Sequence, residues 1–270
     1  MQTELQLLWA AVIAYALAGV LAIFGVLLGK RPERAVLASL LTALALHAAS
    51  IALRWVRVDH GPYVTLFEFL SSNVWSMAAI FAYAYWRYRP VRAIAAIVMP
   101  VLFVMLGWML MNDPEPKQLP ANYHTVWLFI HIGFAKLFSG TVLVALGLAG
   151  VILARTSERG RARFARLPDD ARLDDLAYRF LALGIVFETL MLITGAIWAQ
   201  DAWGRYWAWD PLETWAFITW LTLAFALHWR YAMKSTPRTA AIMIVVIFVL
   251  AFFTFRGVPF ISTAVHQGAI

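Results

Sequence analysis

The sequence predicts an all-α, polytopic membrane protein with about eight transmembrane helices and both termini on the outer side. Three observations carry this prediction: an apolar composition, recurrent apolar runs, and basic residues that gather in alternate loops. Of the 270 residues, 63% are hydrophobic and 14% are charged, whereas soluble domains average about 45–50% and about 25%. The composition therefore excludes a soluble globular domain, a disordered chain and a collagen-like chain.

Each predicted span is a mostly apolar run of about 20 residues, the length that crosses a bilayer core. In chain order the predicted spans are 5–28, 35–55, 63–86, 91–111, 124–153, 177–199, 213–230 and 239–255. The first is expected to be a span and not a signal peptide, because MQTEL before it carries no positive charge and its apolar run is too long. No internal repeat or linker is evident, so residues 1–270 are interpreted as one membrane domain.

The basic residues divide the connecting segments into two sets. Fifteen of the 22 lie in the alternate segments 29–34, 87–92, 154–176 and 230–238. The others are Arg54, Arg57, Lys117, Arg205 and Arg256 in the opposite loops, and Lys136 and Arg179 within spans. The positive-inside rule places the fifteen in the cytoplasm, so the net charge of +7 indicates topology and no nucleic acid partner is expected. In the segment 154–176, Pro168 followed by two aspartates predicts a helix start.

Tryptophan is concentrated in one outer loop, 200–215, and its flanking spans. Seven of the 13 tryptophans are Trp198, Trp203, Trp207, Trp209, Trp215, Trp220 and Trp229. The centre of the loop, WGRYWAWDPLETW (203–215), also holds Arg205, Tyr206 and Asp210. An interfacial aromatic belt would explain tryptophans spread over many span ends. Their concentration in one loop favours instead a stacking surface for a flat apolar ligand.

WGRYWAWDPLETWAFITW closely resembles the tryptophan-rich "WWD" signature of the CcsA/ResC type of haem-handling protein, from System II cytochrome c biogenesis, which reads WGxYWxWDPKETWAFITW. The CcmC and CcmF types keep the tryptophans but diverge after the aspartate. Further resembling segments, within about residues 45–266, are RWVRVDHGPYVTLFEF (54–69), WLFIHIG (127–133), LDDLAYRFLALG (173–184), TGAIWAQDAWG (194–204) and LHWR (227–230). One departure is Leu212, which stands where the family has lysine. If that lysine aids the haem propionates or the substrate, another cation is expected to substitute, with Arg205 as the candidate.

The resemblance implies a haem-binding and haem-delivery subunit of a cytochrome c synthase, or haem lyase, in the bacterial inner (cytoplasmic) membrane. It implies that haem b is presented on the outer side for thioether attachment to a CxxCH apocytochrome c, in complex with a CcsB/ResB-type membrane subunit. The chain has no cysteine, in keeping with thiols supplied by the substrate. Two alternatives stay open: a CcmC-like chaperone that loads haem onto a carrier protein, and a membrane transporter with an aromatic lid loop.

The six histidines are His47, His60, His124, His131, His228 and His266. His131 lies about seven residues, or roughly 10 Å, into the fifth predicted span from its outer end, and His266 lies in the outer C-terminal tail. These two form the most economical ligand pair, one on each side of the tryptophan loop. Interhelical hydrogen bonding is the alternative role for a lone membrane histidine. In the resembling family, the histidines at these two positions are axial ligands of the haem iron.

At the inner side, the resemblance implies that His228 belongs to a second, intramembrane haem site. His47, in the middle of the second predicted span, is a candidate for the other inner ligand, and a residue of the partner subunit is the alternative. His60 and His124 lie in outer loops and are expected to be solvated, although His60 fits the family's G-H-x-P segment.

Several charged residues are candidates for roles beside the haem site. Arg205, Arg54 and Arg57 lie at the outer face, where they could hold haem propionates or snorkel to the interface. Asp210 and Glu213 flank Pro211 and are expected to cap the seventh span rather than carry acid–base chemistry.

Three further charges lie within predicted spans. Glu68 matches the family and is expected to orient the tryptophan loop. Lys136 and Glu188 do not match the family, and both fall near the predicted midplane of adjacent antiparallel spans. Because an unpaired charge at this depth is costly, the sequence predicts a buried Lys136–Glu188 ion pair.

Overall fold

The computed structural model describes residues 2–30, 32–119 and 124–258, apart from the side chain of Arg256. Within these ranges the chain forms helices and connecting loops, and contains no strand. In chain order the helices are α1 (Gln2–Leu27), α2 (Glu33–Val58), α3 (Leu66–Arg87), η1 (Arg89–Ile94), α4 (Ala95–Leu110), α5 (Val126–Ala154), α6 (Glu158–Arg163), α7 (Asp170–Trp203), α8 (Pro211–Met233), α9 (Pro237–Phe252) and η3 (Phe253–Gly257).

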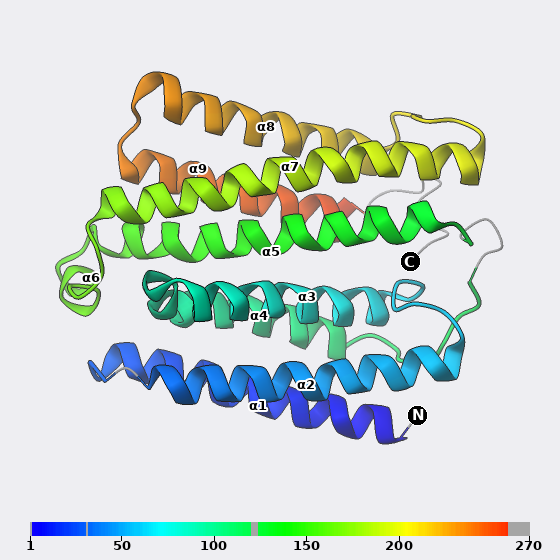
Figure 1. Ribbon diagram of the computed structural model, residues 1–270, viewed down its shortest axis with the longest axis horizontal. Helices are drawn as coiled ribbons and strands as arrows, with labels where there is room; N and C mark the ends of the chain where they lie inside the picture. Colours follow the sequence, from blue (N-terminus) through cyan, green and yellow to red (C-terminus); the bar gives the residue numbers. More distant parts are fainter. Residues whose placement is uncertain (1, 31, 120–123, 259–270) are drawn as a thin grey trace.

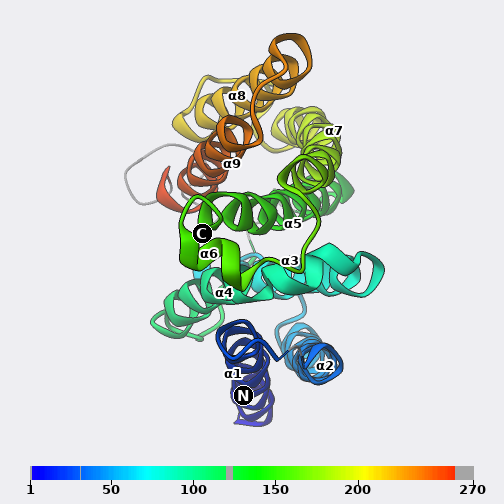
Figure 2. The same ribbon diagram turned by 90° about the vertical axis from the view of Figure 1, so that its left-hand side faces the viewer.

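The long helices lie side by side with roughly parallel axes, and successive ones run in opposite directions (Figure 1). Seen along the axes, α1 and α2 form one edge of the bundle, and α7, α8 and α9 form the other (Figure 2). Helix α5 lies between these edges and packs against α3, α4, α7 and α9. It is also the most buried of the candidate spans, at 67% of its apolar window against 28–50% for the others. The core of the bundle is therefore organised around α5.

Each predicted span overlaps one long helix, which confirms an all-α, polytopic membrane architecture. Six helical segments in the described ranges are both long enough and apolar enough to cross a membrane. Helices α3 and α8, of 22 and 23 residues, are not among these six. They are long enough at 1.5 Å per residue, but serines and an asparagine in α3 and threonines and tryptophans in α8 lower their hydropathy. The total of eight spans therefore stays a prediction.

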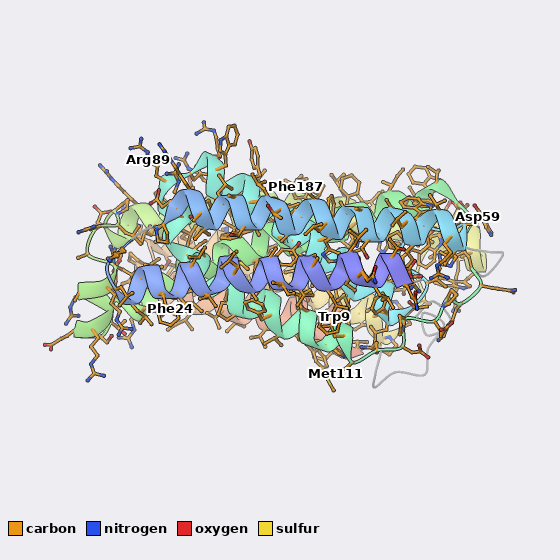
Figure 3. The ribbon with its side chains drawn as sticks, turned by 90° about the horizontal axis from the view of Figure 1, so that it is seen from below. Trp9, Phe24, Asp59, Arg89, Met111 and Phe187 are labelled. Atoms are coloured by element: carbon orange, nitrogen blue, oxygen red, sulfur yellow. The ribbon has the colours of Figure 1, made fainter. Side chains whose placement is uncertain are left out.

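The alternating helix directions bring the four arginine- and lysine-rich segments to one end of the bundle, on the left of Figure 1. Figure 3 shows Arg89 at this end and Asp59 at the opposite end, where the loop 204–210 also lies. This is the segregation that the positive-inside interpretation requires, while the assignment of that end to the cytoplasm stays a prediction. The predicted helix start is confirmed, because Asp169 accepts a hydrogen bond from the Arg172 backbone N–H and caps α7.

Large apolar side chains cover the outer surface of the bundle. On α1, Trp9, Ile13, Leu17, Val20 and Phe24 are each at least half exposed, and Trp9 and Phe24 are labelled in Figure 3. Their spacing of three or four residues places them on one helix face. An apolar face of this kind fits a lipid environment, where burial against water is not required.

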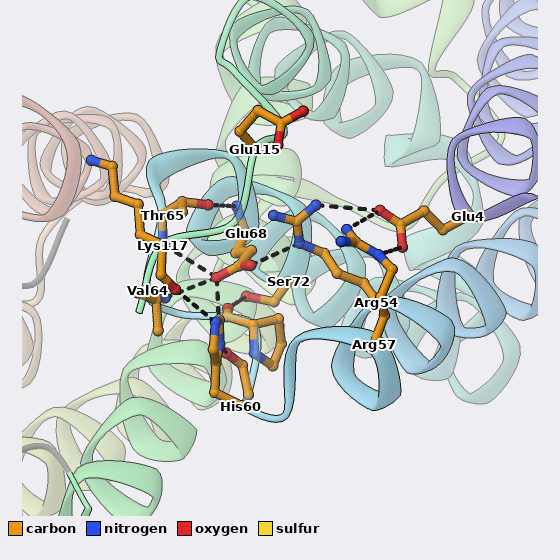
Figure 4. Close-up of polar contacts among 12 residues, drawn as sticks. Glu4, Arg54, Arg57, His60, Val64, Thr65, Glu68, Ser72, Glu115 and Lys117 are labelled. Atoms are coloured by element: carbon orange, nitrogen blue, oxygen red, sulfur yellow. Dashed lines mark hydrogen bonds and ion pairs between the residues drawn. The ribbon is translucent and has the colours of Figure 1, made fainter. Parts of the chain in front are cut away.

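A buried polar network fixes the corner between α2 and α3 (Figure 4). Glu68 closes a capping box with Thr65 at the start of α3, and its Oε2 also accepts a hydrogen bond from the Val64 N–H at 3.0 Å. Its Oε1 accepts from the Arg54 Nε of α2 at 2.7 Å, and Glu68 is fully buried. The Glu68 carboxylate thus joins two helices and the loop between them.

The same network reaches the N-terminal turn of α1 and the segment before α5. Arg54 and Arg57 contact the Glu4 carboxylate at 3.4 and 2.7 Å. His60 is 7% exposed, and its two ring nitrogens face the carbonyl oxygens of Gly61 and Lys117 at 2.9 and 3.0 Å. The expectation that His60 is solvated was therefore wrong, because the segment around Lys117 folds over it.

Replacing Arg54 with Met removes the cation beside the buried Glu68 carboxylate and keeps a side chain of similar length. We expect Arg54→Met to lower the free energy of unfolding by about 3–5 kcal/mol, because it leaves a buried charge without its ionic partner. Thermal unfolding in detergent, followed by tryptophan fluorescence, measures the change.

The control is Arg179→Met. Arg179 and Asp175 form an exposed i,i+4 pair, with 75% and 58% of their side chains accessible, so this change should cost only about 0–1 kcal/mol. Equal unfolding temperatures for the two variants would contradict a structural role for the buried network.

Candidate functional site

A pocket opens beneath the tryptophan loop, between α3, α5, α7 and the start of α8. Its wall is mostly apolar and aromatic, with a few polar side chains. The lining includes His131, Trp198, Tyr206, Trp207, Leu212 and Glu213. An apolar pocket with a few polar groups is the usual form of a small-molecule or cofactor site.

His131 of α5 is held in one orientation by α7. Its Nδ1 lies 2.9 Å from the Met191 carbonyl oxygen, which can only accept, so Nδ1 donates and Nε2 is the basic ring nitrogen. The ring stacks on buried Trp198 with a centroid distance of 5.9 Å and an interplanar angle of 22°. A histidine that binds a metal through one nitrogen typically donates from the other to a carbonyl or carboxylate. The orientation of His131 therefore suits a metal-binding imidazole.

Gly195 allows this close approach of α5 to α7. A Cβ atom at position 195 would lie 2.7 Å from His131 Nδ1 and 2.8 Å from its Cε1, closer than real contacts permit. By contrast, a Cβ at Gly133, two residues after His131 on α5, would have no atom within 4 Å. The absence of a side chain at position 195 thus leaves the space that the imidazole occupies.

The tryptophan loop is fixed at both ends by local hydrogen bonds. Helix α7 ends at Trp203 and is capped by Gly204, whose φ of +72° suits glycine. Asp210 is the N-cap of α8 and accepts from the Glu213 N–H at 3.0 Å, while Glu213 accepts from the Ala208 N–H at 2.8 Å. The predicted capping role of Asp210 and Glu213 is confirmed.

The aromatic residues of the loop face in different directions. Trp207 and Tyr206 line the pocket, and Trp203 packs on Trp198 with ring centroids 4.9 Å apart. The ring of Trp209 lies against that of Trp207, with their centroids 5.6 Å apart, and Trp209 is 66% exposed. Trp215 packs instead on a phenylalanine of η3. Of the aromatic residues within the loop, Tyr206 and Trp207 thus line the pocket directly, and Trp198 lines it from α7.

The other histidines lie elsewhere. His47 is fully buried in α2, where its Nε2 lies 2.9 Å from the Ser71 hydroxyl, and His228 is exposed on α8 toward the basic end of the bundle. Because α2 and α8 form opposite edges, His47 and His228 do not share a site within this chain (Figure 2). His124 is exposed, as expected, and His266 lies outside the described residues.

The arginines offered as propionate partners have other positions. Arg54 and Arg57 are held by Glu68 and Glu4, so neither snorkels as an isolated side chain. Arg205 is exposed on the loop and does not line the pocket. The hydrogen bonds of Glu68 serve the α2–α3 corner, and none that the structure describes reaches the tryptophan loop.

The predicted Lys136–Glu188 ion pair was wrong. Lys136 Nζ donates to Ser72 Oγ at 2.7 Å and to Asn73 Oδ1 at 3.1 Å, both on α3. Glu188 is fully buried, and its carboxylate has no hydrogen-bond partner among the residues with described positions. The physical reason is rotational: at 100° per residue, Lys136 lies about 140° around α5 from His131, which faces α7.

Gly195 and Asn73 were not predicted as site residues. Gly195 lies three residues before Trp198 in an apolar span, and a small residue there is a signal for close helix approach. Asn73, which lines the pocket, could have been noted as a strongly polar residue within an otherwise apolar span.

Comparisons with known proteins give a consistent result. Residues 63–266 match the family described as "Cytochrome C assembly protein". The chain is 30% identical over 238 residues to "Cytochrome c biogenesis protein CcsA" of Guillardia theta, covering 79% of this chain and 78% of that protein. It is 31% identical over 248 residues to a protein of the same name from Prochlorococcus marinus subsp. pastoris, covering 82% and 78%.

The Gly195→Ala substitution tests the contact that orients His131. The added methyl group would overlap the imidazole, so we expect the free energy of unfolding to fall by about 1–3 kcal/mol. Because the ring stacks on Trp198, the tryptophan emission spectrum should also change. Gly133→Ala is the matched control and should leave both unchanged or slightly raise stability. Identical behaviour of the two alanine variants would refute the proposed role of Gly195.

Proposed function

This chain belongs to the cytochrome c assembly protein family, and from that premise we propose that it is the haem-binding and haem-delivery subunit of a cytochrome c synthase. The observation that carries the proposal is the position of His131 at an aromatic pocket, where its Nδ1–H group donates a hydrogen bond to the Met191 carbonyl. Nε2 is then the basic nitrogen for haem iron. The second axial ligand in this proposal is His266, which the family resemblance supplies.

The donor set and the wall of the pocket fit haem. Trp207 and Tyr206 offer flat apolar surfaces, and buried Trp198 keeps the His131 ring in place. The Asp210 cap and the Glu213 hydrogen bond to Ala208 hold the loop over the pocket. When bound, haem b supplies the vinyl groups to which the cysteine thiols of a CxxCH apocytochrome c are joined. The chain itself orients the ring and excludes water.

We place the tryptophan loop on the outer side of a bacterial inner membrane, opposite the basic end of the bundle. Because the chain has no cysteine, the thiols come from the apocytochrome, and a CcsB/ResB-type subunit completes the synthase. An inner haem site at His228 would then take its second ligand from that subunit, since His47 lies at the opposite edge of the bundle.

Co-expression with the partner and a reporter apocytochrome, in a strain without its own synthase, separates the candidate functions. A covalent cytochrome product supports the synthase subunit. Haem that accumulates on a carrier protein without covalent product would instead indicate a chaperone. Transport of another solute, with neither haem product, would indicate a transporter with an aromatic lid.

Substitution of His131 tests the ligand assignment. We expect the purified protein to show a haem absorption spectrum typical of two axial histidines, and His131→Gly to lose most of it because the iron loses one ligand. Added imidazole should restore the spectrum by occupying the space of the lost side chain. His124→Gly, which changes an exposed residue close to the start of α5, is the control and should behave as wild type. A wild-type protein without haem, or a His131→Gly spectrum equal to that of the wild type, would contradict the proposal.

A further inference from the structure

Beside the pocket, one lysine is presented by two polar side chains of α3. Lys136 Nζ donates to Ser72 Oγ at 2.7 Å and to Asn73 Oδ1 at 3.1 Å. Ser72 and Asn73 are each 5% exposed, and Lys136 is half-buried, so the ammonium group is held against two buried polar side chains. A charged side chain within a membrane span is costly, and intramembrane ionisable residues commonly serve function.

The cluster borders the pocket from two helices. Asn73 itself lines the pocket on the α3 side. On α5, the lining residues are His131, Ile132, Ala135 and Ser139. Lys136 is not one of them, but it is offset by only about 40° from Ile132, on the side away from His131. Lys136 therefore lies next to the α5 residues that line the pocket. Its ammonium group donates to Asn73, whose side chain forms part of the pocket wall.

The position of the ammonium group is fixed by the buried corner of the bundle. The Ser72 hydroxyl donates to the Pro62 carbonyl at 2.9 Å while its oxygen accepts from Lys136. Pro62 lies in the same short loop as Val64 and Thr65, whose N–H groups bind the Glu68 carboxylate. The lysine is thus preorganised by rigid neighbours, which lowers the entropy cost of binding an anion.

No other cation in the described part of the chain has a comparable place. Among the lining residues the charged one is Glu213, an acid, and Leu212 is apolar on the loop side. Arg54 and Arg57 contact Glu68 and Glu4, and Arg205 is exposed on the loop. Lys136 is therefore the cation that is connected to the pocket wall, through its hydrogen bond to Asn73.

We infer that Lys136, Asn73 and Ser72 form a subsite for a carboxylate of the pocket ligand, which sets its orientation and selects an acidic ligand over a neutral one. The inference rests on the proposed function, in which the ligand is haem and the carboxylates are its propionates. Lys136 donates a charge-assisted hydrogen bond, and the Asn73 amide N–H group is a further donor at the wall. In this assignment Lys136 takes the role that Arg205 was expected to fill.

Haem and its dimethyl ester distinguish the subsite from the pocket as a whole, because the ester has the same ring and iron but no carboxylates. We expect wild-type protein to retain haem about 10- to 100-fold better than the ester, as one hydrogen bond to a charged group would give. Lys136→Met should bind the two compounds equally and keep its affinity for the ester. The measurement is the rate of loss to an excess of apomyoglobin, followed by absorbance.

Lys117→Met is the matched control, because it removes a lysine from the same outer half of the chain and should keep the preference for free haem. Equal retention of haem and ester by the wild type overturns the subsite and leaves haem binding intact. A Lys136→Met protein that still prefers haem also overturns it. If the wild type binds neither compound, the proposed function fails together with the subsite. Equal retention of haem and ester by the wild type overturns the subsite even where Lys136→Met does not fold.

Discussion

The close approach of α5 to α7 is the constraint on which the rest of the site depends. At Gly195 the backbone of α7 lies so near that the His131 ring occupies the space where a Cβ atom would be. The same approach brings the Met191 carbonyl within hydrogen-bond distance of Nδ1 and places Trp198 against the ring face. The missing side chain at position 195 therefore leaves room for the imidazole, the Met191 carbonyl sets its tautomer, and Trp198 sets its stacking.

Two rigid features hold the remaining walls of the pocket around this pair. The Glu68–Arg54 interaction fixes the α2–α3 corner. At this corner the Ser72 hydroxyl donates to the Pro62 carbonyl and accepts a hydrogen bond from Lys136. On the other side, the Asp210 cap ties the loop to the first turn of α8. Sites supported by packed helices and by hydrogen bonds behind the ligand-facing residues keep their geometry without a bound ligand. This suits a protein that must present a large flat cofactor in one orientation.

The helical layout and the loop structure could be predicted from the sequence because they depend on local patterns. The lengths of the apolar runs predicted the long helices, and the placement of the basic residues predicted which loops share an end of the bundle. The residues around Pro211 predicted the N-cap of α8. Burial and pairing could not be predicted, because they depend on how each helix is rotated and on distant segments. Lys136 and Glu188 have matching depths but face different neighbours, and His60 is covered by a segment 57 residues away. The contact of Gly195 with His131 likewise becomes visible only in three dimensions.

A structure of the haem-loaded complex with its partner subunit, determined by electron cryomicroscopy, tests the central claim most directly. The account predicts iron bound to His131 Nε2, with Nδ1 still donated to the Met191 carbonyl and the porphyrin lying beneath Trp207. Haem bound at another place, with His131 retaining its contacts in the α5–α7 interface and no bond to iron, would contradict the account.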